Sequence, residues 1–361
     1  MTATLARSTQ PVTLTAGKLP KFAPWGALVA SWVVFGVIFL ILQAAGVTKD
    51  FNLVGAIFFG TVLFDIVIYV LSSIIEGARK AKDRLVTSLV ATAFIIALLP
   101  LISLLYTVVS SGLARFDLTF FNSSMRNVIA EGGGALHAIV GTLEITALAT
   151  VISVPIGLLT SVYLVEYGRG GLARAITFFV DVMTGIPSIV AGLFAYALFA
   201  LLLGQAGVRS GAIGAVALSV LMIPVVVRSS EEILKLVPNE LREASYALGV
   251  PKWLTIVKVV LPTSIAGITT GVMLSIARVI GETAPLLLTA GFTASMNYDL
   301  FKDRMMTLPV YVYTQYANQG ADGQLFVDRA WTGALVLIII VMLLNLIARI
   351  VAKVFAPKIA R

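Results

Sequence analysis

The chain has 361 residues, of which 59% are apolar and only 12% are charged, whereas soluble domains carry about 25% charged residues. This composition excludes a soluble enzyme, and the absence of cysteine excludes disulfides, thiolate metal sites and cysteine nucleophiles. The net charge of +8 is better explained by basic cytoplasmic loops of a membrane protein than by a nucleic-acid partner, so no nucleic acid is expected.

Eight apolar stretches follow one another along the chain, and most are long enough for the roughly 20 residues of a membrane-spanning helix. Strands of a membrane barrel need only about 10 alternating residues, so the sequence predicts an all-α polytopic membrane protein. The stretches cover residues 27–46, 52–75, 85–111, 136–165, 173–202, 211–236, 263–290 and 330–352.

The N-terminal part is predicted to differ from the rest. Residues 1–26 form a cytoplasmic tail, polar and expected to be disordered over 1–22, and the first apolar stretch is a retained helix rather than a cleaved signal. Residues 27–84 hold two additional spans that end in a basic run. The six spans of residues 85–361 form a denser block, the predicted core.

The distribution of basic residues orients the spans. With both termini in the cytoplasm, 18 of the 26 lysines and arginines lie inside and 7 lie outside, while Arg278 falls within a span. Membrane proteins place this excess on the cytoplasmic side, so both termini are expected to be cytoplasmic. The outer loops around 112–135 and 291–329 are then candidates for docking an external protein, and the single histidine, His137, is expected at the interface.

A cytoplasmic connection after the sixth span reads as a helix, a turn and a second helix. Asn239 suits a helix N-cap, Gly249 suits the left-handed conformation that ends a helix, and Pro251 can open the next helix. A compact charged helix pair at the membrane surface can fit a groove on a partner, although an ordinary interfacial helix pair would also explain it.

This connection resembles the EAA loop of ABC importer permeases. The residues that carry the resemblance are Glu243, Ala244, Gly249, Leu261 and Pro262. Ser245 and Val259 depart conservatively from the family pattern. The resemblance implies that the loop seats in an ATPase subunit. Since the sequence lacks a G-x-x-x-x-G-K-[ST] phosphate loop, this chain is expected to bind no cofactor, and a separate ATPase chain would use the ATP.

A charged pair in the seventh apolar stretch is the strongest candidate for substrate contact. A charge in hydrocarbon costs at least about 2.5–3.5 kcal/mol and marks function by default. Arg278 and Glu282 are four residues apart, so on one helix they would share a face and could pair. Either they form a structural ion pair, or the forked donors of Arg278 contact an oxyanion.

The segment Arg278–Leu287 (R-V-I-G-E-T-A-P-L-L) resembles the phosphate-specific ABC permeases, and their A subunit more than their C subunit. Residues 185–192 resemble the P-S-I-V-x-G segment of both subunits, and the similarity extends over about 85–355. It implies a type-1 ABC importer (MetI-like) permease core of six helices, here with two extra N-terminal spans.

The resemblance also implies function, partners and location. The chain would be the permease subunit that carries inorganic phosphate across the cytoplasmic (inner) membrane of a prokaryote, a transporter and not an enzyme. Its partners would be a C-type second permease subunit, ATPase subunits, an extracytoplasmic phosphate-binding protein and membrane lipid. The substrate pathway would include Arg278, Glu282, Thr283 and Glu144.

Two alternative functions remain at this point. One is an ABC importer permease for another oxyanion or small solute, against which only the G-E-T-A-P-L-L run argues. The other is a membrane scaffold or a membrane enzyme, which the EAA-like loop and the missing catalytic constellation disfavour.

Other polar features of the spans suggest packing roles. Asp65 is expected to meet a Lys, Ser or Thr partner, and Asp181 to pair with a basic residue. Glu144 could form an ion pair with an arginine or line the pathway, and the sequence favours neither alternative. Gly267 and Gly271 form a G-x-x-x-G pattern, which predicts close helix packing.

Overall fold

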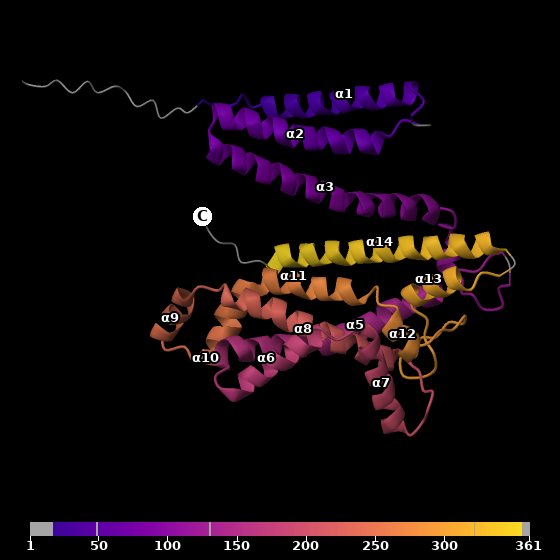
Figure 1. Ribbon diagram of the computed structural model, residues 1–361. Coiled ribbons are helices and arrows are strands. Elements are labelled where there is room, and N and C mark those ends of the chain that lie inside the picture. The colour runs from indigo at the N-terminus through magenta and orange to yellow at the C-terminus, as the bar shows by residue number, and fades with distance from the viewer. Residues whose placement is uncertain (1–16, 48–49, 130, 321, 356–361) are drawn as a thin grey trace, which may run out of the picture. The chain divides into compact units, whose positions relative to one another are not determined.

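A computed structural model describes residues 17–47, 50–129, 131–320 and 322–355, and every regular element in these ranges is a helix (Figure 1). The described residues divide into two compact units, with the boundary after Leu104. Residues 1–16 of the predicted tail lie outside the described ranges. The all-α fold expected from the sequence is confirmed.

The N-terminal unit contains the first two helices and most of the third. Its elements are α1 (Ala23–Ala44), α2 (Leu53–Ile75) and the first part of α3 (Ala78–Gly112). Gly60 of α2 lies against Trp32 of α1, where an added Cβ would come within 2.6 Å of the indole. The Ser88 hydroxyl of α3 donates to the Asp65 carboxylate of α2 at 2.5 Å, which confirms the serine or threonine partner predicted for this acid.

The carboxylate of Glu76 joins three segments of this unit. It accepts two hydrogen bonds from Arg84 at 2.7 and 3.0 Å, one from the Ser72 hydroxyl at 2.9 Å and one from the backbone N–H of Leu19 at 3.1 Å. These bonds, that from Arg84 above all, lower the pKa of Glu76 to about 2. The carboxylate therefore stays ionised at physiological pH, and its contribution to stability is lost only as the pH falls towards 2.

The second unit, residues 105–361, contains the helices of the predicted core. They are α4 (Leu118–Asn122), α5 (Leu136–Val162), η1 (Tyr163–Tyr167), α6 (Gly171–Thr184), α7 (Ser188–Leu203), α8 (Gly211–Lys235), α9 (Asn239–Ala247), α10 (Lys252–Thr255), η2 (Ile256–Val260), α11 (Leu261–Val279), α12 (Ala284–Thr289), α13 (Leu308–Ala317) and α14 (Gly323–Phe355). The elements η1 and η2 are single π-helical turns.

Helix α8 is the centre of the second unit and packs against α5 and α11. Glycines allow the close approach. A Cβ on Gly157 of α5 would come within 2.6 Å of Val226, one on Gly267 of α11 within 2.6 Å of Ile233, and one on Gly271 within 2.5 Å of Ser229. The close packing predicted from the G-x-x-x-G pattern is confirmed.

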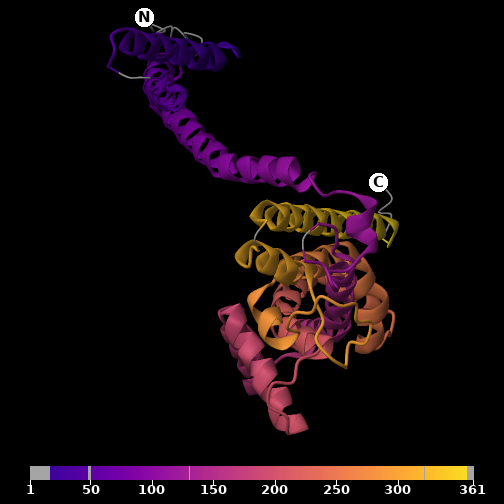
Figure 2. The same cartoon turned by 90° about the vertical axis from the view of Figure 1, so that its right-hand side faces the viewer.

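Seven helices in the described part of the chain are long and apolar enough to cross a membrane. The predicted stretch 173–202 is not one straight helix, because the chain bends by 110° between α6 and α7. Pro187 lacks the N–H that would continue α6 and comes two residues after Gly185, so the helix ends there. Helix α7 leaves the bundle steeply (Figures 1 and 2). The eight predicted spans are reached only if this bent pair counts as one.

The predicted stretch 263–290 is also interrupted, at the place where Gly281 and Pro285 weaken a helix. Helix α11 ends at Val279, residues 280–283 are not helical, and α12 begins at Ala284. Pro285 occupies the first turn of α12, where its missing N–H costs nothing. The apolar stretch is therefore two helices separated by the segment that holds Gly281 and Glu282.

Candidate functional site

The loop that resembles an EAA loop has the predicted helix–turn–helix form. Gly249 ends the first helix with φ of +75°, in the left-handed region that favours glycine. The N-cap of α9 is Pro238 and not Asn239, which is the first helical residue. The Asn239 side chain instead accepts a hydrogen bond from Arg242 at 3.4 Å.

Arg242 fixes this loop to the end of the α5–η1 span. Its guanidinium pairs with Glu166 of η1 at 2.9 Å and donates to the backbone carbonyls of Val237 and Leu234 at 2.6 and 3.1 Å. The Arg242 and Glu166 side chains are only 12% and 5% exposed. Across the turn, Lys252 donates to the backbone carbonyl of Glu166 and lies 4.8 Å from the Tyr167 ring. The loop is therefore held rigidly to the helix bundle.

The other side of the loop is open. Glu243 and Ala244 are exposed, and no atom lies within 4 Å of a Cβ placed on Gly249. Leu248 and Trp253 expose 83% and 61% of their surface, so an apolar patch surrounds the predicted coupling residues. Leu261 and Pro262, the other two predicted coupling residues, lie further along the chain, where α11 begins after η2.

Replacing Arg242 by glutamine should free the loop and leave Glu166 buried without its cation, a change that costs about 3–5 kcal/mol for buried pairs. We expect faster limited proteolysis within residues 237–252, with the protein still inserted in the membrane. The Glu166→Gln/Arg242→Gln double variant removes both charges and should recover part of the protection. Equal proteolysis of the wild type and Arg242→Gln would contradict this anchoring role.

The predicted pathway residues lie around the break after α11. Arg278 is in the last turn of α11 and is exposed, whereas Glu282 and Thr283 lie in the non-helical segment and are half-buried. Because the helix ends at Val279, Arg278 and Glu282 do not share a helical face, and within the described ranges no ion pair joins them. The structural pair considered from the sequence is thus not formed.

Glu144, the fourth predicted pathway residue, lies on α5 and is half-buried. One of its carboxylate oxygens is buried without a hydrogen-bond partner in the described part of the chain. Among the described residues no ion pair joins Glu144 to any arginine, so the arginine considered as one possible partner is not found. The role of all four residues in transport stays a prediction.

His137, expected at the membrane interface, lies at the start of α5 with its side chain buried inside the protein, and its depth in the membrane stays a prediction. It is 1% exposed, and its ring packs edge to face on Tyr311 of α13 with the centroids 5.8 Å apart. Burial raises the pKa of Tyr311. The hydroxyl of Thr142, also on α5, accepts a hydrogen bond from the backbone N–H of Leu308 at 2.7 Å. The start of α13 is therefore bound to α5.

An ionic cluster on α8 was not recognised in the sequence. Arg228 pairs with Asp181 of α6 and with Glu231 at 2.8 Å, and Glu231 also pairs with Lys235 at 2.7 Å. The pairing predicted for Asp181 is confirmed. The spacing of three and four residues between 228, 231 and 235 is the signal that could have revealed the cluster. Asp181 and Glu231 line a pocket of about 440 Å³ together with Arg174.

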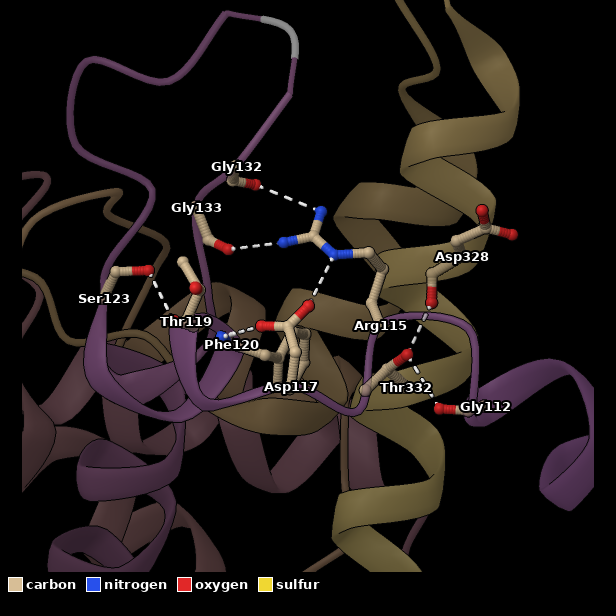
Figure 3. Close-up of polar contacts among 10 residues, drawn as sticks. All are labelled: Gly112, Arg115, Asp117, Thr119, Phe120, Ser123, Gly132, Gly133, Asp328 and Thr332. Atoms are coloured by element: carbon tan, nitrogen blue, oxygen red, sulfur yellow. Dashed lines mark hydrogen bonds and ion pairs between the residues drawn. The ribbon is translucent and has the colours of Figure 1, made fainter.

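The loop between α3 and α5 is organised by Arg115 (Figure 3). Its guanidinium pairs with Asp117 at 3.1 Å and donates to the carbonyls of Gly132 and Gly133 at 3.3 and 3.2 Å. Asp117 in turn caps α4 by accepting the N–H of Phe120 at 2.8 Å, and this bond lowers the pKa of the Asp117 carboxyl. These bonds hold residues 115–120 and 132–133 of the loop together.

Comparison with protein families gives a match over residues 153–361, to the family described as binding-protein-dependent transport system inner membrane component. The phosphate transport system permease protein PstA 1 of Mycobacterium tuberculosis (strain CDC 1551 / Oshkosh) is 48% identical over 278 residues, which are 76% of this chain and 89% of that protein. The phosphate transport system permease protein PstA of Yersinia pestis is 38% identical over 284 residues, 78% of this chain and 93% of that protein.

Solved structures give the same fold. A chain of the bacterial alginate ABC transporter, in complex with alginate pentasaccharide-bound periplasmic protein, aligns with a TM-score of 0.52 at 16% identity and covers 75% of this chain and 96% of that one. A chain of the inward-facing MetNI methionine ABC transporter aligns with a TM-score of 0.50 at 19% identity, covering 62% and 96%. At this level of identity the likeness concerns the fold.

Proposed function

The chain belongs to the family of binding-protein-dependent transport system inner membrane components, and from this premise we propose that it carries inorganic phosphate through the membrane as one permease subunit of an ATP-driven importer. Phosphate is proposed as the substrate because the chain is 48% identical over 278 residues to a relative named as a phosphate transport system permease. The exposed Arg278 beside a helix break is compatible with an oxyanion, because a guanidinium offers forked donors to phosphate.

The α9–α10 loop is proposed as the binding site for the ATPase subunit. Its exposed apolar residues Leu248 and Trp253 suit a groove on a partner, and its ion pair to Glu166 would transmit a displacement of the loop to the α5–η1 span. In this proposal ATP is bound and hydrolysed by separate ATPase subunits. A second permease subunit and an extracytoplasmic phosphate-binding protein complete the importer.

Co-purification and uptake test the proposal together. Tagged chain, extracted from the native membrane, should bring with it an ATPase and a second permease. Proteoliposomes with this complex and the phosphate-binding protein should take up labelled phosphate only when ATP is inside. Preferred uptake of sulfate or molybdate under the same conditions would replace phosphate by another oxyanion, and failure to recover an ATPase would reject the importer.

The orientation proposed for the chain has its own test. Both termini are proposed to be cytoplasmic, because 18 of the 26 basic residues then lie inside. Reporter fusions after residue 361 and within the 291–307 connection should report opposite sides of the membrane. Reporters on the same side would contradict this orientation.

A further inference from the structure

Arg209 and Arg304 lie close together in the second unit, at the end opposite the α9–α10 loop. Arg209 directly precedes Ser210, the N-cap of α8, and Arg304 lies four residues before the first residue of α13. Helix α8 has 25 residues, so a rise of 1.5 Å per residue separates its two ends by roughly 37 Å. If the α9–α10 loop faces the cytoplasm, as proposed above, Arg209 and Arg304 face the extracytoplasmic side.

Backbone hydrogen bonds fix both arginines beside the end of α12. Ser210, which follows Arg209, donates its N–H to the carbonyl of Thr289 at 3.1 Å. Met305, which follows Arg304, donates its N–H to the carbonyl of Ala290, also at 3.1 Å. The two arginines thus arrive from segments almost 100 residues apart in the sequence and are held at neighbouring carbonyls.

Gly291 is the residue on which the two side chains converge. An added Cβ there would lie 3.0 Å from Cδ of Arg209 and 3.3 Å from Cδ of Arg304. Gly291 also has φ of +76°, in the region that other residues rarely adopt. Only glycine therefore allows the chain to turn here while both arginine stems lie against the same backbone point.

Within the described part of the chain, neither guanidinium is neutralised by a carboxylate. Among the described residues no ion pair involves Arg209 or Arg304, and Nε of Arg209 is buried without a hydrogen-bond partner. Two like charges held together repel each other. An anion that accepts hydrogen bonds from both guanidinium groups would relieve the repulsion and satisfy the buried donor.

The surroundings suit a small, hydrated oxyanion. Arg304 lines a pocket of about 410 Å³ whose other residues are mostly polar: Thr293, Ser295, Met296, Asn297 and Asp303. Asn297 shapes this pocket by donating to the carbonyl of Arg304 at 3.1 Å. The Asp303 carboxylate lines it without pairing to either arginine.

We propose that Arg209 and Arg304 form an extracytoplasmic receiving site for the transported oxyanion, which holds inorganic phosphate between its release from the binding protein and its passage to the pathway near Arg278. The inference rests on the proposed function, since it takes phosphate as the transported ion. It adds a site distinct from the helix break, because Arg209 lies before α8 and Arg304 lies in the connection before α13.

Kinetics in proteoliposomes test the site. The complete importer is reconstituted as wild type, Arg209→Gln, Arg304→Gln and Lys302→Gln, and uptake of labelled phosphate is measured against the concentration of phosphate-loaded binding protein. Each arginine variant should lose about tenfold or more in maximal rate, as expected when a charge-assisted hydrogen bond is removed. The half-saturating concentration of binding protein should change less than twofold. Lys302 is exposed in the same connection, so its variant serves as the matched control and should behave as wild type.

Other outcomes overturn the inference. A tenfold rise in the half-saturating concentration with an unchanged maximal rate would mean that the arginines bind acidic residues of the docking protein. If Arg209→Gln does not assemble, Arg209→Lys keeps the charge without the fork. It should transport more slowly than wild type, and full activity would leave only a structural role for the charge. Wild-type uptake in both glutamine variants would defeat the receiving site alone, whereas no phosphate uptake by the wild type would defeat the proposed function.

Discussion

Replacing Arg278 by glutamine is expected to lower phosphate uptake by about 10- to 100-fold, the range for losing a hydrogen bond from a charged group. The side chain is exposed at the end of α11, and no carboxylate pairs with it in the described part of the chain. Its charge is therefore available to an anion, because it is not engaged in an ion pair with Glu282. The measurement is uptake of labelled phosphate in proteoliposomes that contain matched amounts of assembled importer.

A double variant separates this role from a structural pair. If Arg278 and Glu282 only locked each other, removing both charges would restore most of the uptake, because no unpaired charge would remain. We expect Arg278→Gln/Glu282→Gln to stay as inactive as Arg278→Gln while still assembling with its ATPase. Restored uptake in the double variant would return Arg278 to a structural role, and wild-type uptake in the single variant would exclude both roles.

Replacing Gly249 by valine should weaken the coupling between ATP hydrolysis and uptake. No neighbouring atom blocks a side chain at this position, so the cost comes from the backbone. A φ of +75° is a genuine outlier for a β-branched residue, and the left-handed region costs about 1–2 kcal/mol for residues other than glycine. To relieve the strain the turn must change, and this would reorient α9 relative to α10.

The matched control at this position is asparagine, which tolerates the left-handed region. Gly249→Asn should retain most of the uptake, and Gly249→Val should lose at least about tenfold, since 1.4 kcal/mol corresponds to a factor of ten. Both proteins should reach the membrane in equal amounts. Normal ATPase co-purification together with normal uptake in Gly249→Val would refute the role of this turn in coupling.

The helix pattern and the helix–turn–helix form of the α9–α10 loop could be predicted because their signals are local. Apolar stretches give the spans, and Gly249 gives the turn, without knowledge of distant residues. The places of the interruptions are also local signals, since Gly185 and Pro187 break one helix and Gly281 and Pro285 weaken another. The size of the bend and the number of non-helical residues could not be predicted, because hydropathy measures how apolar a segment is and not where its backbone hydrogen bonds end.

Contacts between distant residues could be predicted only in part. Asp65 and Asp181 carried a charge within an apolar stretch, so each had to have some partner, but nothing in the sequence identified Ser88 or Arg228. The convergence at Gly291 could not be foreseen at all. It depends on which backbone carbonyls at the end of α12 accept the two flanking N–H groups, and that choice follows from tertiary packing.

The hydrogen bonds of Glu76 have a consequence for how the protein is made. Its partners among the described residues, Leu19, Ser72 and Arg84, lie within the first 84 residues. The N-terminal unit can therefore close its contacts while the ribosome still has residues 105–361 to add, a task of roughly 10 seconds to a minute at 5–20 residues per second. During biosynthesis this helical unit would be a finished insertion intermediate before the transport core emerges.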